Sequence, residues 1–202
     1  ESDPLIKPSP LKGISDDQTL HRLKIEDLYS ALNSSPNGLT SEVAKEKRKL
    51  AGLNYINPPI DVPNWLCCLL PCFLSAAAMK HYNESVPDYG FVKRNGKWLR
   101  LDCISIVPGD IVRVGKGERV PADIRLIKAA ACVFDGTSIM GKSELIGVDP
   151  DKHSEAYLDS PNMAFLGYLC ISGECTGVVV ATGKSCLVSK LISQKAWPPS
   201  EY

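Results

Sequence analysis

The amino-acid sequence predicts an α+β fold that is mostly β, with a small helical unit ahead of a β domain flanked by short helices. Apolar residues recur at helical spacing in residues 19–32 and again in residues 43–51. From residue 89 the pattern changes to the alternation and the Gly/Pro punctuation that are typical of strands. Helical spacing returns at residues 187–192, which predicts a closing helix.

Length and composition set limits on the architecture. The chain has 202 residues, 44% of them hydrophobic, which is enough for one domain of ordinary size and an appendage. Its 23 basic and 23 acidic residues balance, so charge gives no reason to expect a nucleic-acid partner. We expect a disordered lead-in, the helical unit, an apolar cysteine-rich segment with a linker, and the β domain at residues 1–18, 19–60, 64–86 and 87–194.

The helical unit is expected to contain two helices. Residues 19–32 form the first, and a loop at residues 33–38 follows. Thr40 suits the N-cap of the second helix, because its hydroxyl can accept a hydrogen bond from an unpaired backbone N–H of the first turn. Gly52 suits the C-terminal end of that helix, and a run of prolines after it ends the unit.

Turn signals divide the β domain into strands. Asn95-Gly96 lies between two alternating segments and predicts a hairpin. Residues 163–183 are expected to form two strands joined by a turn at Ser172-Gly173. Three further strands are predicted, in residues 104–114, 120–127 and 131–135.

One stretch of the β domain matches a phosphate-binding pattern. Gly136, four residues, and then Gly141-Lys142-Ser143 fit the P-loop motif G-x-x-x-x-G-K-[ST]. A working P-loop leads directly into a helix whose N-terminus holds phosphate. Here Gly147 follows closely and disfavours a long helix, and bulky residues between the two glycines suit a phosphate loop poorly. Nucleotide binding therefore stands only as an alternative.

Several segments of the chain are similar, in sequence and in order, to one protein family. Residues 107–127, VPGDIVRVGKGERVPADIRLI, and residues 160–183, SPNMAFLGYLCISGECTGVVVATG, resemble the actuator domain of P-type cation-transporting ATPases. Residues 38–54, GLTSEVAKEKRKLAGLN, resemble the N-terminal domain of the same cation pumps. The resemblance implies that the β domain is an actuator with a distorted, jelly-roll-like fold.

The family's actuator carries a loop of the form V-D-x-S-x-L-T-G-E-S, which aligns with residues 134–143. Gly141 and Ser143 match it, whereas Met140 stands at the Thr position and Lys142 at the catalytic Glu position. The resemblance implies that this Glu would position the water that hydrolyses an aspartyl-phosphate. A lysine ammonium has three donors and no acceptor at neutral pH, so Lys142 cannot serve in that role. We therefore expect no catalytic residue in this degenerate loop.

Two further features depart from the family pattern. The phosphorylation motif D-K-T-G-[ST] does not occur in these 202 residues. The family has two membrane helices between its N-terminal domain and its actuator, where this chain has the apolar residues 64–79. A membrane-spanning helix needs about 20 apolar residues, and Pro71 interrupts a stretch that is already shorter than this.

Three cysteines, Cys67, Cys68 and Cys72, lie in that apolar stretch. One interpretation is burial against the β domain. A second is reversible S-palmitoylation, which would hold residues 65–79 at a membrane surface. A third is metal binding, for which three thiolates lack an evident fourth ligand. The other cysteines are expected to be reduced and buried, namely Cys103, Cys132, Cys170, Cys175 and Cys186.

The remaining polar candidates give weaker signals. His21, His81 and His153 are scattered along the chain and match no catalytic triad or metal site. Asp110 and Asp123 lie in the turn motifs PGD and PAD, where hydrogen bonds to the local backbone are expected. We expect no metal and no cofactor.

Together these observations favour a non-catalytic, actuator-like protein that serves as a membrane-associated interaction or regulatory module. Its partner would be a P-type pump or another membrane protein. Its place would be the cytoplasmic face of a membrane, with a soluble cytoplasmic location as the alternative. Two other functions stay open: the N-terminal portion of a P-type cation-transporting ATPase, and a P-loop nucleotide-binding protein.

Overall fold

One antiparallel sheet dominates the structure, a computed structural model in which residues 17–57, 82, 84–141 and 145–197 are described. Its strands are β1 (Tyr89–Arg94), β2 (Lys97–Asp102), β3 (Ile111–Gly115), β4 (Asp123–Asp135), β5 (Leu145–Gly147), β6 (Met163–Ala164) and β7 (Leu169–Ala181). Their order is β2-β1-β3-β7-β4-β5, and β6 pairs with β4 off this path. The predicted α+β fold, mostly β, is confirmed.

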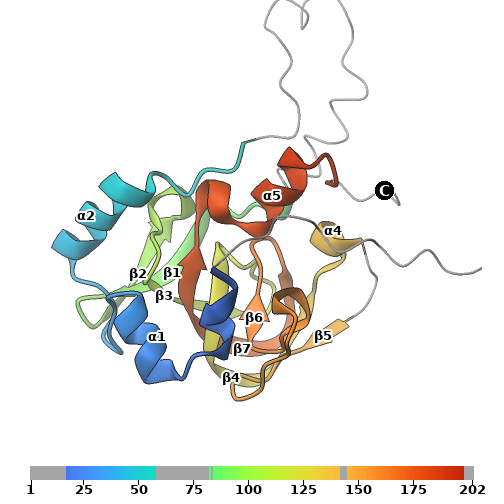
Figure 1. Cartoon of the computed structure of the whole chain (residues 1–202), viewed down its shortest axis with the longest axis horizontal. Helices are drawn as coiled ribbons and strands as arrows, with labels where there is room; N and C mark the ends of the chain where they lie inside the picture. The colour runs from blue at the N-terminus through green and yellow to red at the C-terminus, as the bar shows by residue number, and fades with distance from the viewer. Residues whose placement is uncertain (1–16, 58–81, 83, 142–144, 198–202) are drawn as a thin grey trace, which may run out of the picture.

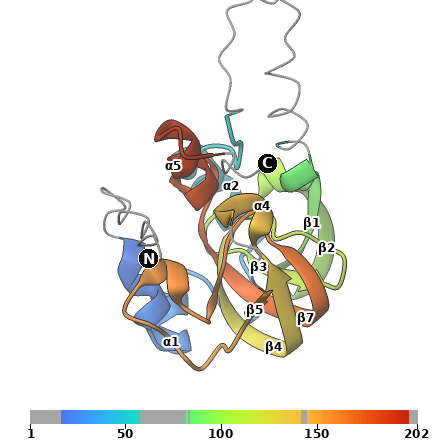
Figure 2. The same cartoon turned by 90° about the vertical axis from the view of Figure 1, so that its right-hand side faces the viewer.

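Short helices surround this sheet (Figure 1). In chain order they are η1 (Asp17–Arg22), α1 (Ile25–Ala31), α2 (Ser41–Ala51), η2 (Cys103–Ser105), α4 (Thr137–Met140), η3 (Tyr157–Asp159), η4 (Gly183–Ser185) and α5 (Leu187–Ser193). Figure 1 and Figure 2 together place α1 and α2 on one side of the sheet and α4 with β5 on the other. The helical unit therefore lies away from the segment that matched the P-loop pattern.

The first part of the helical unit differs from the prediction, and the second part agrees with it. The single helix expected over residues 19–32 is instead η1 followed by α1, because Lys24 between them is extended, with φ −63° and ψ 156°. Thr40 caps α2 as predicted, since its Oγ1 accepts a hydrogen bond from the Val43 N–H at 3.3 Å. Gly52 ends α2 with a φ of 78°.

The Asn95-Gly96 hairpin is confirmed. The two residues join β1 to β2 with φ of 50° and 73°, the left-handed pair that a two-residue turn of type I′ requires. By contrast, the two strands predicted in residues 120–127 and 131–135 are one strand, β4. It stays continuous because β7 pairs with it from end to end, through several register shifts. Ala131 lies within one of these irregularities, with a φ of 47°.

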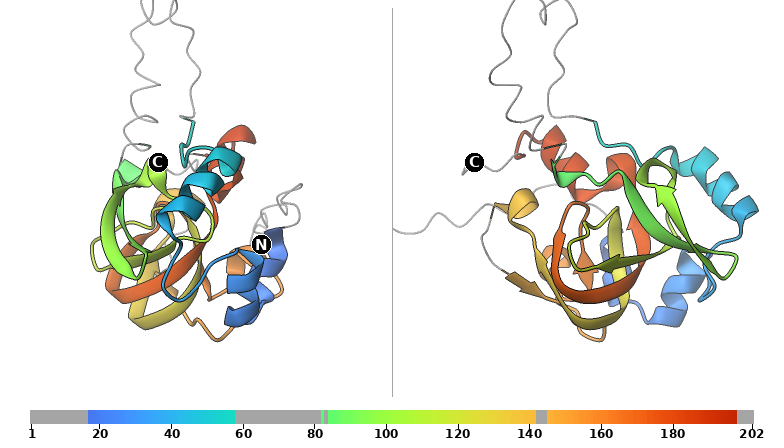
Figure 3. Two further views of the ribbon diagram at one scale, coloured as in Figure 1. Left: turned by 90° about the vertical axis from the view of Figure 1, so that its left-hand side faces the viewer. Right: turned by 180° about the vertical axis from the view of Figure 1, so that it is seen from behind.

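The turn predicted at Ser172-Gly173 is wrong, because β7 runs straight through it. Gly173 has a φ of 70°, and a Cβ there would lie 2.2 Å from the Ala130 carbonyl oxygen. The glycine therefore marks an irregularity of β7 against β4, not a chain reversal. Between β6 and β7, which both pair antiparallel with β4, Gly167 has a φ of 90°. Figure 3 shows the strong curvature of the two long strands.

The hydrophobic core lies along β4 and β7 and is closed by helices. Phe134 and Val178 come from these strands and are fully buried. Leu28 of α1 and Leu187 of α5 belong to the same buried cluster. The helical unit therefore shares the core of the β domain. Asn54 adds a polar link, because its Nδ2 donates to the carbonyls of Cys103 and Pro121, both at 3.0 Å.

Two buried carboxylates, Asp110 and Asp123, fix the turns of the β domain, and we call them the carboxylate anchors. Asp110 accepts a hydrogen bond from the Val107 N–H at 2.9 Å, which is the predicted local bond. It also accepts two from Arg94, at 2.8 Å from Nε and 2.6 Å from Nη2. The sequence analysis missed this ion pair, since its partners lie on different elements.

Asp123 bonds distant backbone and not the local backbone that was predicted. Its two carboxylate oxygens accept hydrogen bonds from the N–H groups of Leu166, at 2.9 Å, and Leu187, at 2.7 Å. This single side chain therefore holds the turn before β7 and the first residue of α5 against the start of β4. Burial, the largest effect, raises the Asp123 pKa to about 6, although both backbone bonds act in the opposite direction.

Candidate functional site

The candidate site is the α4–β5 edge, by which we mean α4, Gly141 and β5. The site begins where β4 ends: the Asp135 carboxylate accepts hydrogen bonds from the Thr137 N–H at 2.8 Å and the Thr137 hydroxyl at 2.5 Å. One helical turn follows, and Gly141 ends it in the left-handed conformation with a φ of 71°. β5 then pairs with the last residues of β4, with Asp135 opposite Leu145. The edge is thus a short helical excursion between two paired strands.

The α4 turn is held against the rest of the domain. Ile139 is buried beneath it. The Trp197 indole N–H donates to the Ser138 carbonyl at 3.1 Å. Arg119 reaches the Ser138 hydroxyl at 3.4 Å and the Gly167 carbonyl at 2.7 Å. These contacts bring together the chain after α5 and the segments before β4 and β7, so the turn has a defined position.

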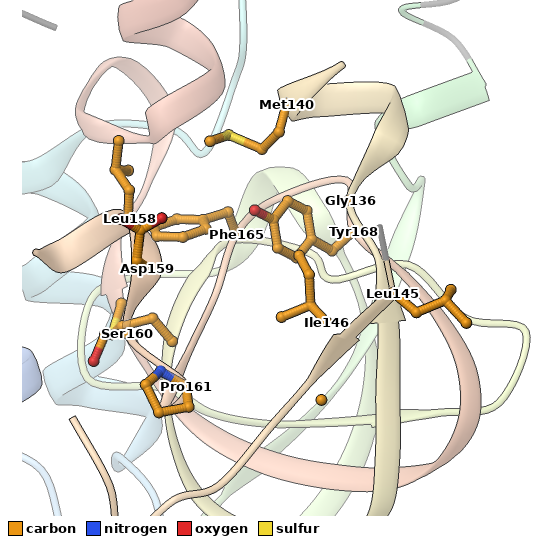
Figure 4. A pocket seen from close by; sticks show the side chains of 12 residues that line it. Gly136, Met140, Leu145, Ile146, Leu158, Asp159, Ser160, Pro161, Phe165 and Tyr168 are labelled. Carbon is orange, nitrogen blue, oxygen red and sulfur yellow. The ribbon is translucent and has the colours of Figure 1, made fainter. Parts of the chain in front are cut away.

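A cavity of about 240 Å³ adjoins the edge, and we call it the Tyr168 cavity. It is lined by Gly136, Met140, Leu145, Ile146, Gly147, Leu158, Asp159, Ser160, Pro161, Met163, Phe165 and Tyr168. Figure 4 shows the side chains of Leu145 and Ile146 on one side and the segment from Leu158 to Pro161 on the other. The Tyr168 ring lies between these walls. The cavity therefore lies between the α4–β5 edge and the segment around η3.

Comparison with known protein families matches two parts of this chain. The family described as "P-type ATPase actuator domain" matches residues 84–195, which is more than half of the chain. The chain belongs to the P-type ATPase actuator family. A second description, "Cation transporter/ATPase, N-terminus", matches residues 20–76, ahead of the actuator. Both resemblances noted in the sequence are confirmed.

Two similar curated proteins are alpha subunits of sodium/potassium-transporting ATPases. The actuator-containing chain is 35% identical over 119 residues to the sodium/potassium-transporting ATPase subunit alpha-4 of Homo sapiens, covering 59% of this chain and 12% of the relative. It is 27% identical over 229 residues to subunit alpha-3 of Gallus gallus, covering 86% of this chain and 23% of the relative. The chain thus spans less than a quarter of the length of these relatives.

A solved crystal structure of a zinc-transporting PIB-type ATPase in its E2.Pi state is also similar. The TM-score is 0.45 and the sequence identity is 20%, over 58% of this chain and 18% of that chain.

The actuator's P-loop match does not have the geometry of a P-loop. The four residues between Gly136 and Gly141 form α4, where a phosphate loop would wrap its amides around the ligand. Strand β5 begins at Leu145, where a P-loop would continue into its helix. The pattern is therefore a coincidence of residue types on an actuator turn.

Of the seven residues named for the degenerate loop and the cysteine cluster, five lie outside the described part of the actuator chain. Met140 ends α4 and faces the Tyr168 cavity, and Gly141 caps the turn. Lys142 and Ser143 lie outside the described residues, as does the cysteine cluster of Cys67, Cys68 and Cys72. Within the described part, no helix is long and apolar enough to cross a membrane.

The histidines are less scattered than the sequence suggests. The ring centroids of His21 and His153 are 6.4 Å apart, and that of His21 is 5.6 Å from Tyr157. His21 is buried, and its Nε2 lies 3.0 Å from the Ser154 carbonyl oxygen. His81 lies outside the described residues. Among those that are described, no group of three or more His, Cys, Asp or Glu side chains is placed to hold a metal ion.

The five cysteines of the β domain are free and buried, as predicted. The fold brings three of them together, which their spacing in the chain does not indicate: the Sγ atoms of Cys132 and Cys170 are 3.8 Å apart, and Cys175 is in hydrogen-bonding reach of Cys132. Burial, the largest effect, raises the pKa of Cys170 to about 12. A thiol held in its neutral form is a poor nucleophile, so Cys170 acts as a core residue.

Proposed function

We propose that this chain is a non-catalytic actuator that docks on a P-type cation pump and regulates it. The observation that carries the proposal is the combination of an intact α4–β5 edge with Lys142 in place of the family's catalytic Glu. The Asp135 bonds to Thr137 and the Gly141 cap keep the turn that leads to this position. The backbone turn that leads to this loop is therefore retained, whereas the family's catalytic Glu is replaced by Lys142.

The exchange of Glu for Lys removes the hydrogen-bond acceptor that the family's reaction requires of this loop. In the family, the Glu orients and activates the water that attacks an aspartyl-phosphate, which requires a hydrogen-bond acceptor. A lysine ammonium only donates. A cation at that position is nevertheless well suited to contact a phosphorylated, negatively charged partner. We therefore infer binding without hydrolysis.

We further propose that the module works at the cytoplasmic face of a membrane. The apolar residues 64–79 stand where the family has its membrane helices, and Cys67, Cys68 and Cys72 are candidates for acylation. The alignment with the alpha-3 subunit extends over 229 residues, more than the 202 of this chain, so that relative has residues in the matched region that this chain lacks. Two or three acyl chains would give stable anchoring where one would be marginal.

Transport by a complete pump is the second candidate. Both family descriptions match in the order that a cation pump has, and the two relatives reported above are sodium/potassium-transporting ATPase subunits. On this alternative the chain is the N-terminal portion of an ATP-driven cation pump. Continuation of its reading frame into a D-K-T-G-[ST] motif would decide for it.

The test uses a sodium/potassium pump whose own actuator Glu is replaced by Gln, so that its phosphorylated form persists. The purified chain is added to the radiolabelled phosphoenzyme, and both binding and loss of label are followed. We expect the wild type to bind and leave the rate of dephosphorylation unchanged. We expect Lys142→Glu to accelerate it and Lys142→Gln, the matched neutral control, to bind without accelerating it. Acceleration by the wild type equal to that of Lys142→Glu, or no binding by any form, would overturn the proposal.

A further inference from the structure

An exposed apolar patch lies where the helical unit meets the β domain, and we call it the Leu53 patch. Its members are Leu50, Leu53, Tyr55 and Ile104, which are 89%, 47%, 51% and 38% exposed. They are four of the nine large hydrophobic side chains that are exposed in the described part of the chain. Single exposed apolar residues are normal on a protein surface, whereas a group of them in one place marks a contact surface.

The backbone holds the patch residues in outward positions. Exposure alternates along residues 53–56, where the second and fourth side chains are buried. The buried Asn54 donates its backbone N–H to the Ile104 carbonyl at 3.2 Å, and its Oδ1 accepts a hydrogen bond from the Gly183 N–H at 2.9 Å. These bonds bring η2 and η4 beside residues 53–56. The Leu53 patch is therefore a fixed surface built from three segments of the chain.

Exposed cations border the Leu53 patch. Arg48 and Lys49 come from the last turn of α2, and Lys184 comes from η4. The Arg48 guanidinium donates to a serine hydroxyl of η2 at 3.3 Å, which places it beside the patch. Glu46 and Asp102 are the acidic residues close to the patch in the sequence, so positive charge is in excess. An apolar centre with lysine and arginine around it is typical of surfaces that rest on anionic lipid headgroups.

The apolar residues 64–79 connect to the described structure at this same place. The Tyr82 hydroxyl donates to the Ile56 carbonyl at 2.5 Å, so the residues that flank this segment on its two sides are in contact. Figure 1 and Figure 3 show residues 52–57 and α5 together at one end of the molecule. A membrane that holds residues 64–79 would therefore face the Leu53 patch.

We propose that the Leu53 patch rests on an anionic membrane surface, with its apolar side chains at the boundary of headgroups and acyl chains. Arg48, Lys49 and Lys184 would then lie against the negatively charged headgroups. The inference rests on the proposed membrane location and adds an orientation to it. One acyl chain alone gives marginal binding, and a chain combined with a basic surface gives stable binding. The patch is thus a second attachment beside the cysteine cluster.

The test measures co-sedimentation of the purified, unacylated full chain with phosphatidylcholine vesicles, with and without phosphatidylserine. We expect tighter binding to the vesicles that contain phosphatidylserine. Leu50→Ser/Leu53→Ser should weaken that binding about tenfold. Lys49→Glu/Lys184→Glu should remove most of the preference for phosphatidylserine. Leu145→Ser is the matched control, because it changes a leucine of β5 that is 63% exposed, and it should bind like the wild type.

Thermal denaturation without vesicles establishes that each variant is folded. Equal binding to the two kinds of vesicle, unchanged binding of Leu50→Ser/Leu53→Ser, or an equal loss in Leu145→Ser would each overturn the proposal. Dimerisation of the wild type that the double leucine variant abolishes would also overturn it, because a second copy would then cover the patch. The assay contains neither acyl groups nor a pump. Its failure is therefore distinguishable from failure of the proposed acylation or of the proposed docking on a pump.

Discussion

The carboxylate anchors and the Tyr168 cavity are both buried parts of the β domain, but they treat their polar groups in opposite ways. Asp110 is matched by Arg94 and a backbone N–H, and Asp123 by two backbone N–H groups. The Tyr168 hydroxyl instead points into a cavity (Figure 4). Buried groups that are fully matched specify one backbone arrangement. The difference therefore separates the part of the domain that fixes the fold from the part that lines a cavity.

The largest effect is expected at the Asp110 anchor. Arg94→Met leaves a fully buried carboxylate without its cation, and the loss of one partner of a buried pair costs about 3–5 kcal/mol. Urea denaturation would measure the loss of unfolding free energy. Lys152→Met is the matched control, because its ion pair with Asp149 is exposed, and we expect no measurable change there. If the two substitutions lowered the unfolding free energy by similar amounts, burial of the Asp110 carboxylate would not explain the stability that its ion pair contributes.

The next effect is expected where the cavity meets the α4–β5 edge. A Cβ at Gly136 would lie 2.9 Å from Tyr168 Cζ and 3.0 Å from Ile146 Cδ1. Gly136→Ala should therefore force a shift of both side chains and destabilise the domain by about 1–3 kcal/mol. Gly147→Ala lies on the same cavity, and its Cβ would meet nothing within 4 Å. Thermal denaturation should rank the two clearly, and equal stabilities would show that the cavity absorbs the added methyl group.

A pH-dependent effect of intermediate size is expected at the Asp123 anchor. The Asp123 pKa is about 6 in the folded protein, against an ordinary value of 3.8. The folded state thus holds this proton more tightly than the unfolded chain does. Stability from this group increases as the pH falls through 6 toward 3.8 and is lost as the pH rises above 6.

Asp123→Asn cannot follow this titration. From pH 7 to pH 5 we expect the unfolding free energy of the wild type to increase by about 1 kcal/mol relative to the variant. Urea denaturation of both proteins at the two pH values gives the difference directly. If the two proteins respond to pH in parallel, Asp123 does not titrate in this range.

The smallest effect on stability is expected at Tyr168 itself. Tyr168→Phe deletes a hydroxyl that faces the cavity, so the unfolding free energy should change by less than about 0.5 kcal/mol. Asn54→Ala is the contrasting variant, because that side chain joins three backbone groups of the β domain. Its loss should cost several times more. A large cost for Tyr168→Phe would place its hydroxyl among the structural contacts and remove the contrast with the anchors.

The features predicted correctly from the sequence are those set by neighbouring residues. The Asn95-Gly96 turn, the Thr40 cap and the Gly52 end each depend on the conformation and side chain of one or two residues. Ser172-Gly173 also predicted a turn, but the structure has the continuous strand β7 there. A glycine with a positive φ fits a turn or a bulge equally well, and only the pairing of β7 with β4 decides between them.

The candidate site was predictable only in part, for the same physical reason. The family resemblance located the loop and the change at Lys142, because both are written in consecutive residues. The partners of Asp123 and the environment of Tyr168 come from segments far apart in the chain. Consecutive residues of the sequence therefore indicate neither the partners of Asp123 nor the surroundings of Tyr168. Tyr168 in particular looks in the sequence like any aromatic residue of a buried strand.

The pairing of β4 with β7 also has a kinetic consequence. The two strands meet along their whole lengths, from Asp135 opposite Leu169 to Asp123 opposite Ala181, yet β5, η3 and β6 lie between them in the chain. No short hairpin can start this pairing, so the intervening chain must first be ordered into a closed loop. Domains dominated by such non-local contacts fold on a scale of roughly milliseconds to seconds. During synthesis, β4 must therefore wait for β7 before the centre of its sheet can form.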